Sequence, residues 1–316
     1  MRVLIPAVVF MVLGCSDPGR GGATPPEPVD QAATADREAA QTPPATPTPP
    51  SDDQPSLPPE VAEALKRANA DVPPPPPGDD QARVALQLIA RNHPEQAEPV
   101  ARAALVAHPD QPRAAFVLGL SLHKQKRYSD ALPFFEQALA GAAAIEATQR
   151  AQQFPEHAHV AHFLGWARYY AGDLDGARGA FTSHVATVPT AGDSWYGIAL
   201  VEIDEDQVDA AAAALERAMA CLSEAERAEE SRSRDRGKIL ARQGDLALRS
   251  DRTQDAVDLY RRALRAWPDH YEVWAKVARC YDRLGDAQAA DRARVEELKA
   301  RERMGRIVDP AKGGQP

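Results

Sequence analysis

The fold of this 316-residue chain is decided by the stretch "GDLDGARGAFTSHVATVP", residues Gly172 to Pro189. Within it Ala177 is followed four residues later by the large ring of Phe181, and a proline closes the run. Residues i and i+4 lie on the same face of a helix, so the small and the large side chain share one face. The pattern returns in "DRTQDAVDLYRRALRAWP", residues 251–268. This repetition indicates a chain built from copies of one helical unit.

The spacing of these alanines gives the length of the unit. The anchor alanines are Ala97, Ala131, Ala177, Ala211, Ala256 and Ala290. Successive anchors are 34, 46, 34, 45 and 34 residues apart. The two longer steps carry 12 and 11 extra residues, which fall at 146–157 and 227–237. Because an extension between two units is absorbed more easily than one inside a unit, we predict six units with two inserts.

Small residues also mark the first helix of the units. Leu118-Gly119 and Leu164-Gly165 occur at matching positions, and Gly244 stands alone in the fifth unit. Two helices can approach closely only where Gly or Ala lies at their crossing and a large residue fills the adjacent gap. This combination resembles the tetratricopeptide repeat (TPR), a helix hairpin of 34 residues with Leu-Gly in its first helix and Ala, aromatic, Ala and Pro in its second.

The resemblance implies an all-α fold, a right-handed α-solenoid of about six hairpins within residues 78–304. The repeats are expected near residues 78–111, 112–145, 158–191, 192–225, 237–270 and 271–304. The packing residues it implies are Gly119, Ala131, Gly165, Ala177, Phe181, Ala211, Gly244, Ala256, Tyr260 and Ala290.

The N-terminus, "MRVLIPAVVFMVLGC", carries one arginine and then an apolar run from Val3 to Leu13. That run has the length of a signal-peptide core and is shorter than the roughly 20 residues of a membrane-spanning helix. Gly14 and Cys15 follow, and "VLGC" resembles the lipobox of bacterial lipoproteins. The resemblance implies a signal peptide over residues 1–14 and lipidation of Cys15. Ser16 after the cysteine favours the periplasmic face of the outer membrane.

We expect residues 15–77 to form a disordered, proline-rich tether between the lipidated cysteine and the repeats. Seventeen of the 28 prolines in the chain lie between residues 16 and 80, with few aliphatic and no aromatic residues. Such a segment cannot bury enough apolar surface to offset its ordering entropy, so we predict disorder. A short amphipathic helix is expected at residues 58–71, and residues 305–316 are expected to form a disordered tail.

The composition argues against a catalytic or a nucleic-acid-binding protein. The formal net charge is -9 and the pI is about 5.4, whereas binding to phosphates needs clustered Lys and Arg. The sequence holds no phosphate-binding loop, no Gly-x-Ser-x-Gly motif and no His-Glu-x-x-His motif. We therefore expect no enzyme activity and no cofactor.

An aromatic stretch, "HAHVAHFLGWARYYAGD", occupies the first helix of the third repeat, residues 157–173. By resemblance to TPR domains, the groove-facing positions that would contact a partner are Phe116, His123, His159, His162, Trp166, Tyr169, Tyr170 and Tyr196. Aromatic side chains with polar edges are typical of interface hot spots. The alternative left open is that these rings pack against an adjacent helix or against the insert at 146–157.

The sequence therefore predicts a non-catalytic, lipid-anchored envelope protein whose solenoid binds a protein or peptide, as pilotins of type IV pilus secretins do. One alternative is a periplasmic metal- or small-molecule-binding module that uses His159 and His162. We expect no metal site, because no Cys or carboxylate lies at ligand spacing from this pair. The other alternative is a cytosolic TPR scaffold, if the N-terminal signal is misread.

Overall fold

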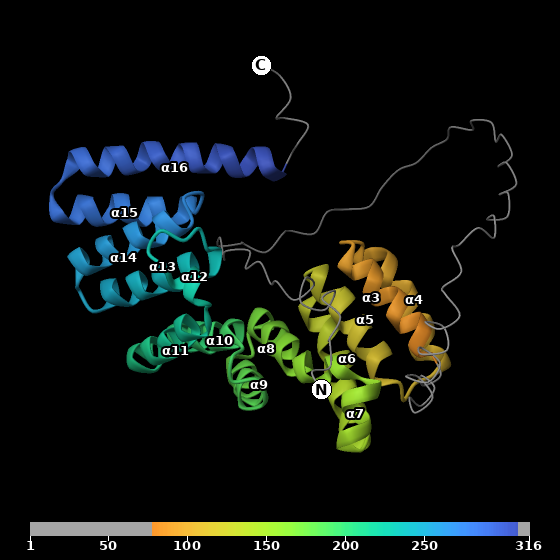
Figure 1. Ribbon diagram of the computed structural model, residues 1–316. Helices are drawn as coiled ribbons and strands as arrows, with labels where there is room; N and C mark the ends of the chain where they lie inside the picture. Colours follow the sequence, from red (N-terminus) through yellow and green to blue (C-terminus); the bar gives the residue numbers. More distant parts are fainter. Residues whose placement is uncertain (1–77, 309–316) are drawn as a thin grey trace, which may run out of the picture. The chain divides into compact units, whose positions relative to one another are not determined.

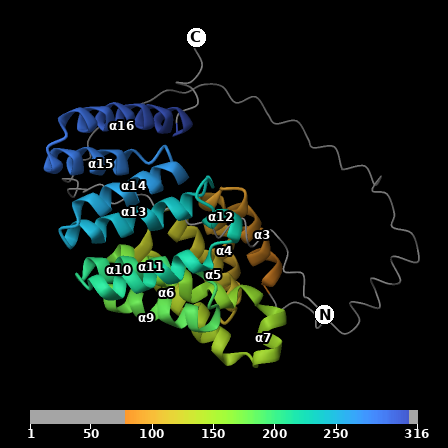
Figure 2. The same ribbon diagram turned by 60° about the vertical axis from the view of Figure 1, so that its left-hand side comes forward.

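The computed structural model describes residues 78–308, and every regular element in that range is a helix (Figures 1 and 2). The predicted signal peptide, Cys15, the tether and the predicted helix at 58–71 lie outside the described residues. The tail from residue 309 onward does as well. The last helix ends at Val308, four residues beyond the predicted end of the repeat domain at 304.

Twelve of the helices form six hairpins, each made of a first and a second helix. The pairs are α3 (Asp79–Ala90) with α4 (Pro94–Ala107), α5 (Pro112–Lys124) with α6 (Tyr128–Ala144), α8 (Val160–Ala171) with α9 (Leu174–Thr187), α10 (Gly192–Asp204) with α11 (Val208–Cys221), α13 (Arg234–Arg249) with α14 (Thr253–Ala266), and α15 (Tyr271–Leu284) with α16 (Ala287–Val308). Consecutive hairpins pack on one another, and both views show α13 to α16 as successive layers (Figures 1 and 2). The chain is thus the α-solenoid that the spacing of the alanines predicts.

The turn inside each hairpin contains one residue with a positive φ angle. These residues are Asn92, Lys126, Gly172, Asp206, Asp251 and Gly285. They repeat with the same 34, 46, 34, 45 and 34 steps as the anchor alanines. A left-handed residue ends a helix by turning the chain back on itself, so the backbone follows the same register as the side chains.

The crossing inside a hairpin depends on a glycine that faces a ring. A Cβ atom placed on Gly165 would lie 2.6 Å from the Phe181 ring, and one placed on Gly244 would lie 2.5 Å from the Tyr260 ring. All ten predicted packing residues are buried. The ring therefore occupies the volume that a side chain on the first helix would otherwise need.

The two predicted inserts differ in structure. The first forms α7 (Ala147–Gln153) and a 3-10 helix (Pro155–His159). The second, residues 227–237, begins at the last residue of the short helix α12 (Glu224–Arg227), has no regular helix over residues 228–233 and then enters α13. Phe154 of the first insert is 1% exposed. Glu156, two residues later, pairs with the buried guanidinium of Arg113 on α5 at 3.1 Å, and the same guanidinium pairs with Asp79 at the start of α3. The first insert is therefore part of the core between the first three hairpins.

Two glycine substitutions in the third hairpin test the close approach. Gly165→Ala should lower the free energy of unfolding by roughly 1–3 kcal/mol, because the added methyl group overlaps the Phe181 ring. Gly179→Ala is the matched control: no atom lies within 4 Å of its added Cβ. It should raise the free energy of unfolding by about 0.5–1 kcal/mol, because Ala favours a helix over Gly. Urea unfolding measures both, and equal effects of the two substitutions would contradict the glycine–ring contact.

Candidate partner-binding surfaces

The predicted partner-binding stripe on the first helices is largely buried. Six of its eight side chains are buried: Phe116, His123, His162, Trp166, Tyr169 and Tyr196. The prediction that these side chains line an open groove is therefore wrong. His159 and Tyr170 are half-buried, and their contact with a partner stays a prediction.

Packing against the first insert accounts for part of this burial. The ring centroid of Phe154 lies 5.8 Å from that of Phe116, and Phe116 lies 5.8 Å from Phe163 of α8. Arg113 also lies over the Phe154 ring, 5.8 Å from its centroid. These contacts correspond to the alternative in which the aromatic side chains pack against an adjacent helix and the insert.

Trp166 is held among rings from both helices of its hairpin. Its ring meets Phe181 edge-on at 5.2 Å and stacks on Tyr170 at 5.7 Å. Tyr170 in turn stacks on Tyr128 of α6 at 4.4 Å. Sequence reasoning missed Tyr128 because it counted groove positions on first helices only, and Tyr128 begins a second helix. The indole Nε1 of Trp166 has no hydrogen-bond partner among the described residues.

The histidines of the third hairpin form a hydrogen-bonded cluster around Ser194 of α10. The Ser194 hydroxyl lies 2.7 Å from Nδ1 of His162 and 2.8 Å from Nδ1 of His184, and it can donate to one ring while accepting from the other. His184 Nε2 lies 3.3 Å from Nδ1 of His159. Burial lowers the pKa of all three imidazoles, that of His184 to about 4.

This cluster does not have the arrangement of a metal site. Within residues 78–308, no three His, Cys, Asp or Glu side chains are placed to share an ion. His162 is one of the two residues of the metal-binding alternative, and its Nδ1 atom is hydrogen-bonded to the Ser194 hydroxyl. The histidines therefore join α8, α9 and α10 as neutral hydrogen-bonding groups.

The Asp245 carboxylate of the fifth hairpin is paired. Asp245 accepts a hydrogen bond from the Tyr260 hydroxyl at 2.6 Å and from the Lys276 ammonium at 2.6 Å. Burial acts to raise the pKa of Asp245, but the charge and hydrogen bonds of its partners outweigh burial and lower it. This carboxylate therefore links α13, α14 and α15.

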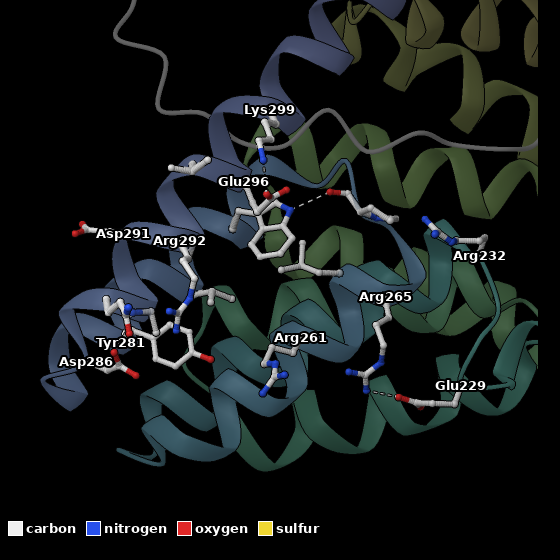
Figure 3. Close-up of a pocket in the computed structure, with 18 of the residues that line it drawn as sticks. Glu229, Arg232, Arg261, Arg265, Tyr281, Asp286, Asp291, Arg292, Glu296 and Lys299 are labelled. Carbon is white, nitrogen blue, oxygen red and sulfur yellow. Dashed lines mark hydrogen bonds and ion pairs between the residues drawn. The ribbon is translucent and has the colours of Figure 1, made fainter.

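An open groove of about 1320 Å³ lies between the second helices α14 and α16, with α15 between them (Figure 3). We call it the α14–α16 groove. Its apolar lining includes Leu264, Trp274 and Val277, and the indole of Trp274 is fixed by a hydrogen bond from Nε1 to the carbonyl of Pro268 at 2.9 Å. Sequence reasoning missed this groove, since its walls come from two hairpins that meet only on stacking.

Comparison with known proteins identifies the repeats. A sequence model of the tetratricopeptide repeat matches residues 85–155 and 164–226, and a second such model matches residues 247–302. No curated protein sequence matches the chain.

Several solved structures share the architecture. PilW, described as a widely conserved type IV pilus biogenesis factor, superposes with a TM-score of 0.54 at 17% identity, over 68% of this chain and 90% of PilW. PilF of Pseudomonas aeruginosa gives a TM-score of 0.52 at 16% identity, over 68% of this chain and 88% of PilF. A chain of the APC/C hetero-tetramer Cut9–Hcn1 gives 0.56 at 13% identity, over 76% of this chain and 42% of that chain. At these identities the similarity shows the fold alone.

The histidine cluster predicts a loss of stability in mild acid. Unfolded histidines bind protons near pH 6.5, whereas folded His162 and His184 bind them only at lower pH. The unfolded state then holds more protons, so the free energy of unfolding should fall as the pH drops from 7 towards 4. His184→Gln keeps a hydrogen-bonding group that does not titrate, and it should make this fall shallower.

Urea unfolding at pH 7, 6 and 5 measures this difference. His93→Gln, an exposed position at the start of α4, is the control and should leave the pH dependence unchanged. Parallel curves for the wild type and His184→Gln would show that the buried imidazole does not carry the effect.

Proposed function

Because this chain belongs to the tetratricopeptide-repeat family, we propose that it is a non-catalytic scaffold, lipid-anchored in a bacterial cell envelope, that holds a protein partner. A protein-interaction role is the common use of this fold, since stacked hairpins present long surfaces built from neighbouring units.

The α14–α16 groove is the observation that carries partner binding. Pockets for small ligands usually hold about 300–1,000 Å³, and this groove, at about 1320 Å³, is larger. Its walls are the helices α14 and α16, with half-buried Trp274 and Tyr281 between them. A groove of this size and lining is better matched to a segment of another protein than to a small molecule.

The anchor rests on the N-terminal sequence, which lies outside the described residues. An apolar run ends at Gly14-Cys15, and the proline-rich residues 16–77 follow before the first hairpin. Several acyl chains on one cysteine would hold the chain on a membrane stably, since a single chain binds only marginally. None of the helices between residues 78 and 308 combines the length and apolarity needed to span a bilayer.

The fold shared with PilW suggests an assembly role as one form of the scaffold. PilW is described as a pilus biogenesis factor, and a lipid-anchored solenoid on the periplasmic face of the outer membrane could hold a subunit during construction of such a machine. We therefore propose a pilotin-like assembly factor as the specific form of the scaffold.

Replacing the lipidation site tests the anchor. Cys15→Ala should move the protein from the membrane pellet to the soluble periplasmic fraction and abolish incorporation of a labelled fatty acid. Cys221→Ala, in the fourth hairpin, should leave both properties unchanged. Wild-type distribution of Cys15→Ala together with no acyl label on the wild type would remove the anchor from the proposal.

Site-specific cross-linking tests partner binding in intact cells. A photoreactive amino acid at Gln288, which lines the α14–α16 groove, should give a covalent adduct with a partner protein. The same residue at Gln96, an exposed site on α4, is the matched control and should give none. Absence of any adduct at Gln288 would rule out the groove as the scaffold's binding site.

A further inference from the structure

Three unpaired cations stand on the walls of the α14–α16 groove. Arg232 lies in the loop before α13, Arg261 on α14 and Arg292 on α16, and all three are exposed. None of the three guanidinium groups makes an ion pair or a side-chain hydrogen bond with another described residue. Their donors therefore remain available to carboxylates from outside (Figure 3).

The carboxylates of the groove are mostly engaged already. Glu229 pairs with Arg265 and Arg236, Asp291 with Arg294, Glu296 with Lys299, and Asp286 accepts from the backbone N–H of Ala289. Glu230 is the one lining carboxylate with no partner among the described residues. The unpaired charge in the groove is thus predominantly positive.

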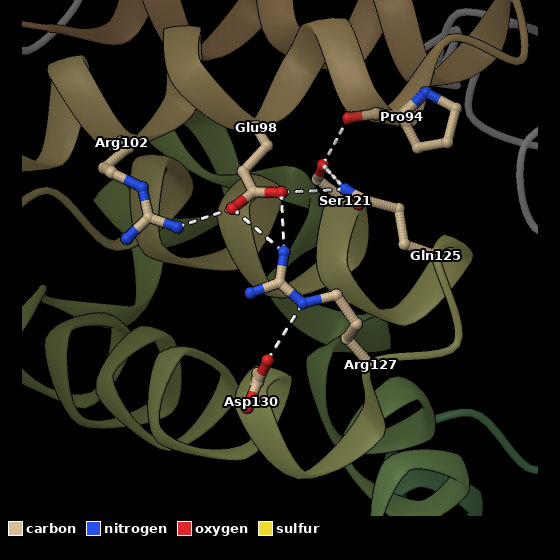
Figure 4. Close-up of polar contacts among 7 residues, drawn as sticks. All are labelled: Pro94, Glu98, Arg102, Ser121, Gln125, Arg127 and Asp130. Carbon is tan, nitrogen blue, oxygen red and sulfur yellow. Dashed lines mark hydrogen bonds and ion pairs between the residues drawn. The ribbon is translucent and has the colours of Figure 1, made fainter. Parts of the chain in front are cut away.

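The surface of the first two hairpins that corresponds to this groove by repeat position has no such free cations among its described residues, because its arginines pair with its own carboxylates (Figure 4). There Glu98 of α4 accepts from Arg102 at 2.6 Å and from Arg127 at 3.0 Å, and Arg127 also reaches Asp130. Arg102 and Arg261 each follow an anchor alanine by five residues, so they occupy the same repeat position. Arg102 finds Glu98 four residues earlier, whereas the residue four before Arg261 is the buried Val257.

The surroundings of the groove are basic although the chain is acidic. Residues 229–304, which include every residue that lines the groove, contain eighteen Lys and Arg against fifteen Asp and Glu, while the whole chain has a formal net charge of -9. Long-range attraction therefore steers an acidic partner towards the last two hairpins.

The groove also contains an apolar surface on which a partner side chain can pack. Leu264 and Val277 are buried in its floor, and the rings of Trp274 and Tyr281 are half-buried beside them. In protein interfaces, most of the affinity comes from a few bulky side chains that enter desolvated apolar pockets. Arg and aromatic side chains are common around such pockets.

We propose that the α14–α16 groove binds an acidic segment of the partner protein. One bulky apolar side chain of that segment packs on Trp274 and Tyr281, and its carboxylates pair with Arg261 and Arg292. The proposal rests on the scaffold function above and specifies the chemistry of the partner.

Labelled peptides test this specificity on the full-length protein in detergent. The probes are a peptide of roughly 14 residues, about four helical turns, made of Glu, Leu and one Phe, a counterpart with Lys in place of each Glu, and one with Ala in place of Leu and Phe. Fluorescence anisotropy should show binding of the Glu peptide that weakens with added salt, and little binding of the other two.

A charge exchange identifies the residues. The double variant Arg261→Glu with Arg292→Glu should weaken binding of the Glu peptide by about tenfold or more and should gain affinity for the Lys peptide. Arg91→Glu, an exposed position in the turn after α3, should leave binding within about twofold. Equal binding of the Glu and Lys peptides, or no change in the double variant, would overturn the proposal.

Three further readouts distinguish other occupants. Binding of full-length Cys15→Ala to phosphatidylglycerol vesicles that the double variant loses would assign the groove to anionic lipid and overturn the proposal. A wild-type dimer in sedimentation that the double variant loses would assign it to a second copy, with the same consequence. An adduct at Gln288 with a partner segment that lacks carboxylates would leave the scaffold function intact and refute the acidic specificity alone.

Discussion

The contact between a glycine on one helix and an aromatic ring on its neighbour is the constraint on which this structure depends. Phe181 makes this contact with two helices, because a Cβ on either Gly165 or Gly197 would lie 2.6 Å from its ring. One side chain of α9 thereby sets the distance to α8 in its own hairpin and to α10 in the next. The same contact recurs between Gly119 and Phe135 in the second hairpin and between Gly244 and Tyr260 in the fifth. In a repeat protein the long core arises from contacts between neighbouring units.

The buried Arg113 fixes the position of the first insert, which the glycine–ring contact does not determine. Its guanidinium pairs with Asp79 of the first hairpin and Glu156 of the first insert while lying over Phe154. Taking such charges out of water costs about as much as their attraction returns, so the group is weak evidence for added stability. Its geometry instead fixes where the insert closes on the second hairpin, a position that no 34-residue repeat specifies.

The architecture could be predicted from sequence because it follows from spacing. Steps between Ala97, Ala131 and Ala177 gave the hairpins and located the insert. The exposure of Trp166 could not be predicted in that way, because its helix position fits a groove while Tyr170, Phe181 and neighbouring rings bury it. The α14–α16 groove was hidden for another reason: its walls come from α14 and α16 of two hairpins, which meet only when the hairpins stack.

The order of the hairpins along the chain has a mechanical consequence. The residues that precede α3 join the first hairpin, whereas the α14–α16 groove belongs to the last two. Tension between an N-terminal attachment and a ligand in that groove would pass through every hairpin in series. The two inserts interrupt this load path at the second-to-third and fourth-to-fifth junctions. At the second junction the exposed Glu229 pairs with Arg236 of α13 and Arg265 of α14, so these ion pairs would have to break before the array could extend there under a pull.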